Sequence, residues 1–223
     1  MRHLKAAAML LVAFGLMMTL SACEEEHHPA ESKGGATAIV LVNFQLSFLA
    51  PDGPMAVAQG QVDPMIKAAN AVIAAARKQV VPVIYVKDEF SPFQFAGNMS
   101  RGYAAMRFEA GSALDPRLDG SAGIYLTKDR RDAFSNPYLE SYLKTVAAGR
   151  LAIAGVHADR SVLETARSAI ALGYKVTVIG DAVATDSDEA RDSALKQLKD
   201  AGAQIQTSDE FIASLSGGEK QGG

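Results

Sequence analysis

The sequence predicts a single doubly wound α/β domain, with a mostly parallel sheet in a Rossmann-like, three-layer α/β/α arrangement. Short apolar runs rich in β-branched residues alternate along the chain with amphipathic segments of helical period. Strands joined by such helices form right-handed βαβ units. With 223 residues, of which 48% are hydrophobic and 21% charged, the chain suits one packed domain. We place this domain at residues 37–216 and expect a disordered tail over 217–223.

The apolar runs predict the strands. The run over 38–42 is continuously apolar, as expected for a strand that is buried on both faces of a parallel sheet. The other strands are expected at residues 82–86, 124–127, 151–156 and 176–179, with an edge strand at 204–207. The irregular stretch over 90–123 contains Gly, Pro and Ser throughout, and a loop of that length is usually functional or disordered.

Caps, prolines and glycines place the helices between these strands. Asp-Pro at 63–64 and Asn-Pro at 136–137 each combine an N-cap residue with proline at the first helical position. Gly149 and Gly173 are expected to end the helices that precede the fourth and fifth strands. A further amphipathic helix is expected over 186–201.

The first residues resemble an export signal rather than part of the fold. Two basic residues precede an apolar stretch over 6–20, which is too short to span a bilayer comfortably. The tetrapeptide Leu-Ser-Ala-Cys that ends at Cys23 resembles a bacterial lipobox, in which the cysteine is lipidated. We therefore expect a lipoprotein signal peptide over 1–22 and a lipidated flexible linker over 23–36.

The residue after the expected lipidation site indicates the membrane to which the lipoprotein is sorted. By resemblance to Gram-negative sorting, Glu24 favours the outer membrane, so we expect the domain at the cell envelope, anchored to the outer membrane and facing the periplasm. Cys23 is the only cysteine, so the mature chain would have no disulfide and no thiol side chain for chemistry. A net charge of -3 gives no reason to expect a nucleic-acid partner.

Polar side chains follow the predicted strands at the points where the strands end. The residues concerned are Asn43, Asp88, Lys128 and His157, with Ser161 just beyond His157. Ligands bind beyond the carboxyl ends of open parallel sheets, so Asn43, Lys128 and Ser161 are expected on one rim. A lysine beside a helix N-terminus suits a small-molecule carbonyl or carboxylate ligand.

Three segments then show a resemblance to a known family. IVLVNFQLSFL is similar to a D-x-Q-x-x-F opening strand, and TKDRRDAF is similar to a K-x-x-x-S-A-F segment. GVHADRSVLETARSAIALGYKVTVIGDAVAT is similar to a G-V-x-T-D-x-C-V-x-x-T-A-x-x-A segment and its continuation. These segments, in this order, resemble the isochorismatase-like hydrolases, the cysteine hydrolase family. The resemblance spans nearly the whole domain and implies that family's fold.

The resemblance also implies a catalytic triad with two changes. The amidase branch of the family uses Asp, Lys and Cys, and the matching positions here are Asn43, Lys128 and Ser161. An amide accepts no proton at neutral pH, and a serine hydroxyl needs a general base. A Ser161–Lys128 dyad would require a lysine whose pKa is lowered by desolvation. In the isochorismatase branch the Asp donates a proton, and Asn43 has no carboxylic proton to give.

Two functions therefore stay open. One is weak or altered hydrolysis of small amides or related C–N substrates. The other is a catalytically inactive ligand-binding or scaffolding pseudoenzyme of the cell envelope. The family commonly forms dimers or larger assemblies, so a homo-oligomer is also expected as a partner state.

The remaining site residues follow from the same resemblance. His157 and Ser161 would form an oxyanion-type turn, with a non-proline cis peptide bond before His157. Nicotinamidases of the family bind zinc through Asp-x-His after the second strand, whereas residues 88–90 here read Asp-Glu-Phe, so we expect no metal and no cofactor. The pocket residues are expected to be Phe44, Gln45, Phe48, Asp88 and Phe134.

Each of these residues also has a purely structural interpretation. Ser161 with Glu164 fits a capping box, and Asp159 is an equally good N-cap. Asn43 could simply cap the exit of the first strand, and the phenylalanines could belong to the core. The His157 side chain could reach Ser161 as a general base, or it could point away.

Overall fold

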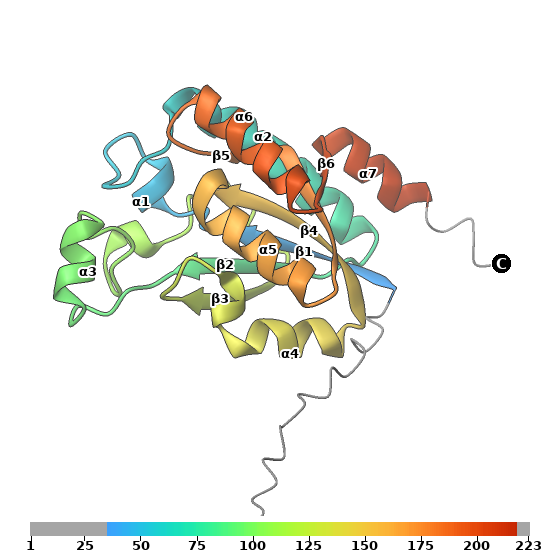
Figure 1. Cartoon of the computed structure of the whole chain (residues 1–223), viewed down its shortest axis with the longest axis horizontal. Helices are drawn as coiled ribbons and strands as arrows, with labels where there is room; N and C mark the ends of the chain where they lie inside the picture. Colours follow the sequence, from blue (N-terminus) through green and yellow to red (C-terminus); the bar gives the residue numbers. More distant parts are fainter. Residues whose placement is uncertain (1–34, 218–223) are drawn as a thin grey trace, which may run out of the picture.

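The computed structural model describes residues 35–217 as one domain, a six-stranded parallel sheet with helices on both faces (Figure 1). The strand order β3-β2-β1-β4-β5-β6 confirms the predicted doubly wound α/β fold. The strands are β1 (Ala36–Val42), β2 (Val83–Asp88), β3 (Ile124–Lys128), β4 (Ala148–Val156), β5 (Lys175–Ala184) and β6 (Gln204–Gln206).

The helices connect these strands in chain order. They are α1 (Leu46–Leu49), α2 (Gln59–Lys78), α3 (Phe95–Ser100), α4 (Pro137–Thr145), α5 (Leu163–Ala171), α6 (Asp188–Asp200) and α7 (Ser208–Gly217). Two short 3-10 turns, η1 (Ala110–Ser112) and η2 (Ala133–Ser135), and a π-helical turn, η3 (Ala158–Val162), complete the described chain.

β1 lies inside the sheet and is covered on both faces. Ile39 and Leu41 pack with α2 and α7 on one side, whereas Val40 and Val42 pack with α4, α5 and α6 on the other. Figure 1 shows α4 and α5 in front of the sheet. Successive side chains of β1 point to opposite faces of the sheet, and helices shield both faces from water. The β1 sequence is therefore apolar throughout and does not alternate between apolar and polar residues.

The winding of the chain reverses between β1 and β4. β2 and β3 lie on one side of this pair and β5 and β6 on the other, so a cleft is expected beyond the carboxyl ends of β1 and β4. The two strands approach so closely that a Cβ atom on Gly155 would lie 1.9 Å from the Val42 carbonyl oxygen. Gly155 also has a φ of 133°, which only glycine adopts readily. His157 and Ser161 follow this close approach directly.

Helix α2 begins a turn earlier than the Asp-Pro pair at 63–64 predicts. It starts at Gln59, so the proline lies inside the helix. The buried Gln61 explains the difference, because its Nε2 donates to Asp188 Oδ1 at 2.9 Å and its Oε1 accepts from Thr185 N at 3.0 Å. These tertiary hydrogen bonds hold the first turn, and no local pattern shows them.

The other helix ends differ less from expectation. Asn136 caps α4 as predicted, since its side chain accepts a hydrogen bond from Tyr138 N at 2.9 Å. α4 ends at Thr145 and not at Gly149, because Gly149 already lies in β4. α6 is capped by Ser187, so the helix begins slightly later than expected.

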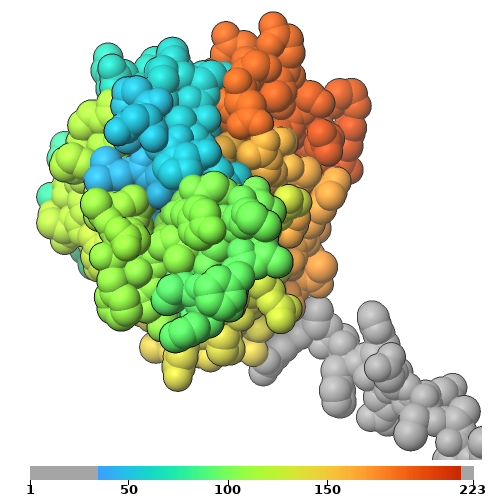
Figure 2. All heavy atoms as spheres, turned by 90° about the vertical axis from the view of Figure 1, so that its left-hand side faces the viewer, coloured from blue at the N-terminus to red at the C-terminus, as the bar shows by residue number. Residues whose placement is uncertain are grey.

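The segment between β2 and β3 carries α3 and η1 and is tied to the rest of the domain. Phe90 N donates to Ala105 O at 3.0 Å, and Ala105 N donates to Ser47 Oγ at 2.9 Å. Figure 2 shows this segment, in green, across the face towards which the carboxyl ends of the strands point. It therefore covers part of the end of the sheet where a ligand site is expected.

The predicted signal peptide, Cys23, most of the linker and the tail from 218 lie outside the described residues. Within residues 35–217, no helix combines the length and the apolar character needed to cross a bilayer.

The role given to Gln61 can be tested by stability. We expect Gln61→Met to lower the free energy of unfolding by about 2 kcal/mol, because the buried Thr185 N–H loses its acceptor. Gln59→Met, on the exposed side of the same turn, is the matched control and should change it by less than about 0.5 kcal/mol. Urea unfolding followed by circular dichroism measures both, and equal effects would contradict the role of Gln61.

Candidate functional site

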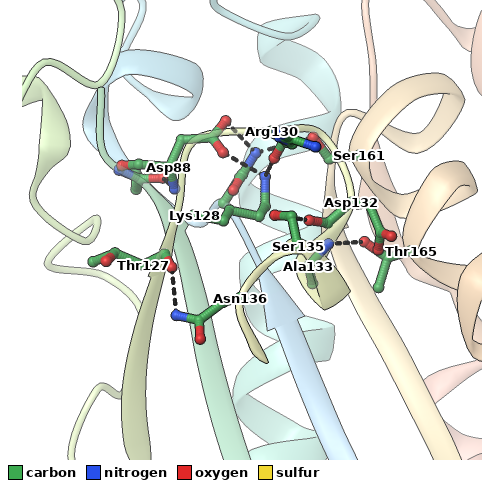
Figure 3. A network of polar contacts seen from close by, with 12 residues as sticks. Asp88, Thr127, Lys128, Arg130, Asp132, Ala133, Ser135, Asn136, Ser161 and Thr165 are labelled. Atoms are coloured by element: carbon green, nitrogen blue, oxygen red, sulfur yellow. Dashed lines mark hydrogen bonds and ion pairs between the residues drawn. The ribbon is translucent and has the colours of Figure 1, made fainter. Parts of the chain in front are cut away.

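A buried ion pair joins the ends of β2 and β3. Asp88 and Lys128 are partners in the parallel register, and Lys128 Nζ pairs with Asp88 Oδ1 and donates to Arg130 O at 3.0 Å (Figure 3). The Lys128 side chain is 0% exposed, so it is not an ordinary surface lysine. Burial raises the pKa of the Asp88 carboxyl, and the neighbouring Lys128 ammonium and Asn43 amide oppose that rise.

Asn43 links this ion pair to Ser161. Its backbone has a φ of 59°, the left-handed region that asparagine tolerates better than most residues. Nδ2 donates to Asp88 Oδ2 at 2.9 Å and to Ser161 Oγ at 3.3 Å. Oδ1 is buried and has no hydrogen-bond partner among the described residues. Asn43 therefore serves as a donor between a carboxylate and a hydroxyl, and it accepts no proton from either.

Ser161 faces Asn43 and does not cap a helix. It lies within η3, and α5 continues from that turn at Leu163 with no side-chain cap. Asp159 does not cap the helix either, because its Oδ1 accepts a hydrogen bond from Thr185 Oγ1. The capping-box alternative is therefore wrong, since the π-helical turn removes the helix terminus on which it depends. No hydrogen bond joins Ser161 to Lys128 in the described part of the chain.

The His157 side chain points away from Ser161. The Val156–His157 peptide bond is cis, as the resemblance implies. His157 Nε2 lies 3.1 Å from Met55 O, and the ring meets Phe48 edge-on with centroids 5.5 Å apart. Burial lowers the pKa of the imidazole, so the neutral form is favoured. His157 therefore contributes to this site through its backbone, which forms part of the turn. Its side chain does not act as a general base for Ser161.

The Gln45 side chain positions Asp88 by hydrogen bonds to the Asp88 backbone. Gln45 Nε2 donates to Asp88 O at 2.7 Å and to Ser112 O at 3.0 Å, while Gln45 Oε1 accepts from Asp88 N at 2.7 Å. The side chain thus continues the hydrogen bonding of the sheet beyond the end of β2. It fixes the carboxylate and does not reach the ligand space.

A cavity of about 320 Å³ opens beside these groups. Asn43, Phe48, Asp88, His157 and Ser161 all line it, so the switch point of the sheet brings together most of the expected site.

Three expected pocket residues do not line this cavity. Phe44 is buried in the core on the α2 side of the sheet, and Gln45 is held against Asp88. Phe134 lies in η2 and packs towards Tyr174, with ring centroids 5.9 Å apart. Lys128 is covered by Asp88 and likewise does not form the cavity wall.

Four arginines in the cavity wall were not among the expected site residues. They are Arg101, Arg130, Arg131 and Arg160. Arg130 and Arg131 directly follow Lys128 at the end of β3, so their place at the rim could have been expected. Arg101 lies in the segment between β2 and β3, and no sequence pattern indicates that this segment folds back over the site.

The donor set does not fit the zinc site of the family's nicotinamidases. The Asp88 carboxylate is engaged by Lys128 and Asn43, and Phe90 stands where that site needs a histidine. The Arg101 guanidinium carbon lies 3.6 Å from the Phe90 ring centroid, which places a protein cation there. Among residues 35–217, no group of three or more His, Cys, Asp or Glu side chains could hold a metal ion.

The structure is an α/β fold with a cleft at the carboxyl ends of its parallel strands, which is where ligands bind in sheets of this kind. The isochorismatase domain family matches residues 37–210, so the chain belongs to the isochorismatase family.

The relatives are distant. A ureidoacrylate amidohydrolase of Pseudomonas savastanoi is 25% identical over 213 residues, which cover 84% of this chain and 87% of that protein. An Arabidopsis thaliana protein named "Probable inactive nicotinamidase" is 34% identical over 91 residues, 40% of this chain and less than half, 46%, of that protein. A cysteine hydrolase structure from Pseudomonas syringae has a TM-score of 0.73 at 18% identity, over 81% of this chain and 92% of that chain. This likeness shows the shared fold.

The contact between position 43 and the Asp88 carboxylate can be tested by a double-mutant cycle of the two residues. Asn43→Asp would put a second carboxylate about 3 Å from Asp88 and should cost about 2 kcal/mol of unfolding free energy. Asp88→Asn should cost about 3 to 5 kcal/mol, because it leaves Lys128 buried without its counterion. The double variant keeps one carboxylate, so its cost should be about 2 kcal/mol less than the sum.

Chemical denaturation of the three variants measures this coupling. Asp129→Asn, which changes an exposed carboxylate on the same rim, is the control and should have an effect below about 0.5 kcal/mol. Strict additivity of the two substitutions would contradict the geometry described above.

Proposed function

We propose that this protein is a ligand-binding member of the isochorismatase family whose cleft takes a small carbonyl or carboxylate compound. Hydrolysis of small amides or related C–N substrates at this cleft is then absent. One observation carries the proposal: the Ser161 hydroxyl accepts a hydrogen bond from the Asn43 amide, while Lys128 is engaged with Asp88. Within the described part of the chain, this hydroxyl therefore has no hydrogen bond to a general base, and a serine without a base is a poor nucleophile.

The shape of the site supports binding. The cavity lies at the low end of the size range of small-molecule sites, and its wall combines apolar rings with a few polar groups. The turn from the cis peptide bond to Ser161 is present, and such backbone turns can hold a carbonyl oxygen whatever the side chain. The name of the Arabidopsis relative, an inactive nicotinamidase, agrees with a family member that has lost turnover.

Slow hydrolysis through Ser161 is the second candidate. It is favoured by the position of Asp88, which lines the same cavity as Ser161 and carries a negative charge. A water molecule bound between the two groups would pass the hydroxyl proton to this carboxylate. The raised pKa of Asp88 makes it a stronger base than an ordinary aspartate.

Turnover of a panel of small amides, and of isochorismate, separates the two candidates. We expect no detectable product with the wild type, and we expect turnover from a variant that combines Asn43→Asp, Asp88→Asn and Ser161→Cys. The triple variant supplies a thiol and a carboxylate on β1 without placing two carboxylates in contact. Wild-type hydrolysis that Ser161→Ala abolishes would overturn the binding proposal and establish the second candidate.

We propose further that the protein is a lipoprotein of the cell envelope, anchored through Cys23 and held at the outer membrane. β1 starts at Ala36, at the end of the sheet opposite to the cleft, so a membrane tether would leave the cleft open.

This location is tested by fractionation of cells that express the full chain. We expect the wild type in the membrane fraction and Cys23→Ala in the soluble fraction, because the acyl chains need the thiol. Ser21→Ala, which keeps a small residue two positions earlier, is the control and should stay with the membrane. Recovery of Cys23→Ala with the membrane at the wild-type level would contradict the anchor.

A further inference from the structure

Arg101 brings a positive charge to the cleft, and no carboxylate within residues 35–217 is in ion-pair contact with it. Its Nη2 donates to Asn98 Oδ1 at 2.8 Å and lies 3.4 Å from Gln94 Oε1, and both of these acceptors are neutral. Its Nε is buried and has no hydrogen-bond partner among the described residues. A guanidinium held by neutral amides keeps its full charge for a ligand.

Two carboxylates in the cavity wall, Asp88 and Asp129, act electrostatically on this guanidinium, but neither forms an ion pair with it. Asp88 is engaged in the ion pair with Lys128, and no ion pair joins Arg101 to a carboxylate within residues 35–217. Two other arginines of the wall differ in this respect. Arg160 pairs with Asp186, and Arg131 pairs with Glu164.

The surroundings hold the guanidinium in one orientation. Its central carbon lies 3.6 Å from the centroid of the Phe90 ring, a cation–π stack. Next to the two Nη atoms, a Cβ atom on Gly97 would lie 2.9 Å from Arg101 Nη1 and 3.2 Å from Nη2, so the absence of a side chain at Gly97 leaves room for the group. A planar donor fixed in this way suits the paired oxygens of a carboxylate better than a flexible lysine would.

We propose that Arg101, stacked on Phe90, is the subsite for a ligand carboxylate. The ligand is then a small carboxylic acid whose amide or ester carbonyl lies against the turn at Ser161, because Arg101 and Ser161 line the same cavity of about 320 Å³. Arg130, also in the wall, adds to the positive potential that attracts an anion. The placement of the ligand carbonyl at the turn rests on the proposed function. The placement of the ligand carboxylate is argued from the surroundings of Arg101 alone.

Matched ligand pairs test the subsite by calorimetric titration of the wild type. The probes are malonamate, succinamate and glutaramate, each compared with its neutral diamide. We expect at least one acid to bind about tenfold or more tightly than its diamide, as charge-assisted hydrogen bonds imply. Three chain lengths are needed because the acid must span from Arg101 to the turn.

Variants identify the residue responsible. Arg101→Gln should abolish the preference for the acid, and Arg101→Lys should reduce it. Gly97→Ala keeps every charge but displaces the guanidinium, so it should also reduce the preference. Arg107→Gln is the control: it removes an exposed arginine of the same segment, one that pairs with Glu89 at 2.7 Å, and should leave the preference intact.

The outcomes separate the subsite from the proposed function. If the diamides bind and the acids bind no better, the subsite is wrong and the ligand-binding function stands. If neither acids nor diamides bind, both are overturned for this ligand class. If Arg101→Gln does not fold, the subsite is tested by Arg101→Lys and Gly97→Ala, which should both weaken the preference for the acid over its diamide. An unchanged preference in both variants would reject the subsite.

Discussion

The buried ion pair between Asp88 and Lys128 is the interaction on which the rest of the site depends. Lys128 has no exposed side-chain surface, so its charge is tolerated only beside a carboxylate. That carboxylate comes from the neighbouring strand in register, and Gln45 holds its backbone in place. Once the two charges are paired, neither the lysine nor a β1 residue is available as a base for Ser161.

The position of the Asp88 carboxylate is compatible with the amide at position 43. The resemblance places an aspartate where β1 ends, but here the negative charge comes from the end of β2. An aspartate at position 43 would face Asp88 directly, whereas the Asn43 amide donates to Asp88 and to Ser161. The amide is therefore the compatible group at position 43, and the altered triad is a consistent electrostatic arrangement.

Part of the site could be predicted and part could not. Asn43, Lys128 and Ser161 were expected at one rim because the carboxyl ends of parallel strands meet there. Asn43 and Ser161 do line the cavity, whereas the Lys128 side chain is buried behind Asp88. The contact between Asp88 and Lys128 was not expected, because it depends on β2 and β3 being neighbours in register. Arg101 was missed for a different reason, since the segment that carries it folds over the cleft through contacts with distant residues.

The sequence by itself determined the fold class, because the alternation of apolar strands with amphipathic helices is a local signal that any compact solution must satisfy. It also determined which polar residues end the strands. Only the tertiary structure decided how these residues pair and which way they face. Asn43 turns to Asp88, His157 turns to Met55, and α2 starts where Gln61 finds its partners. The physical reason is that buried polar groups must find partners, and these come from segments far away in the chain.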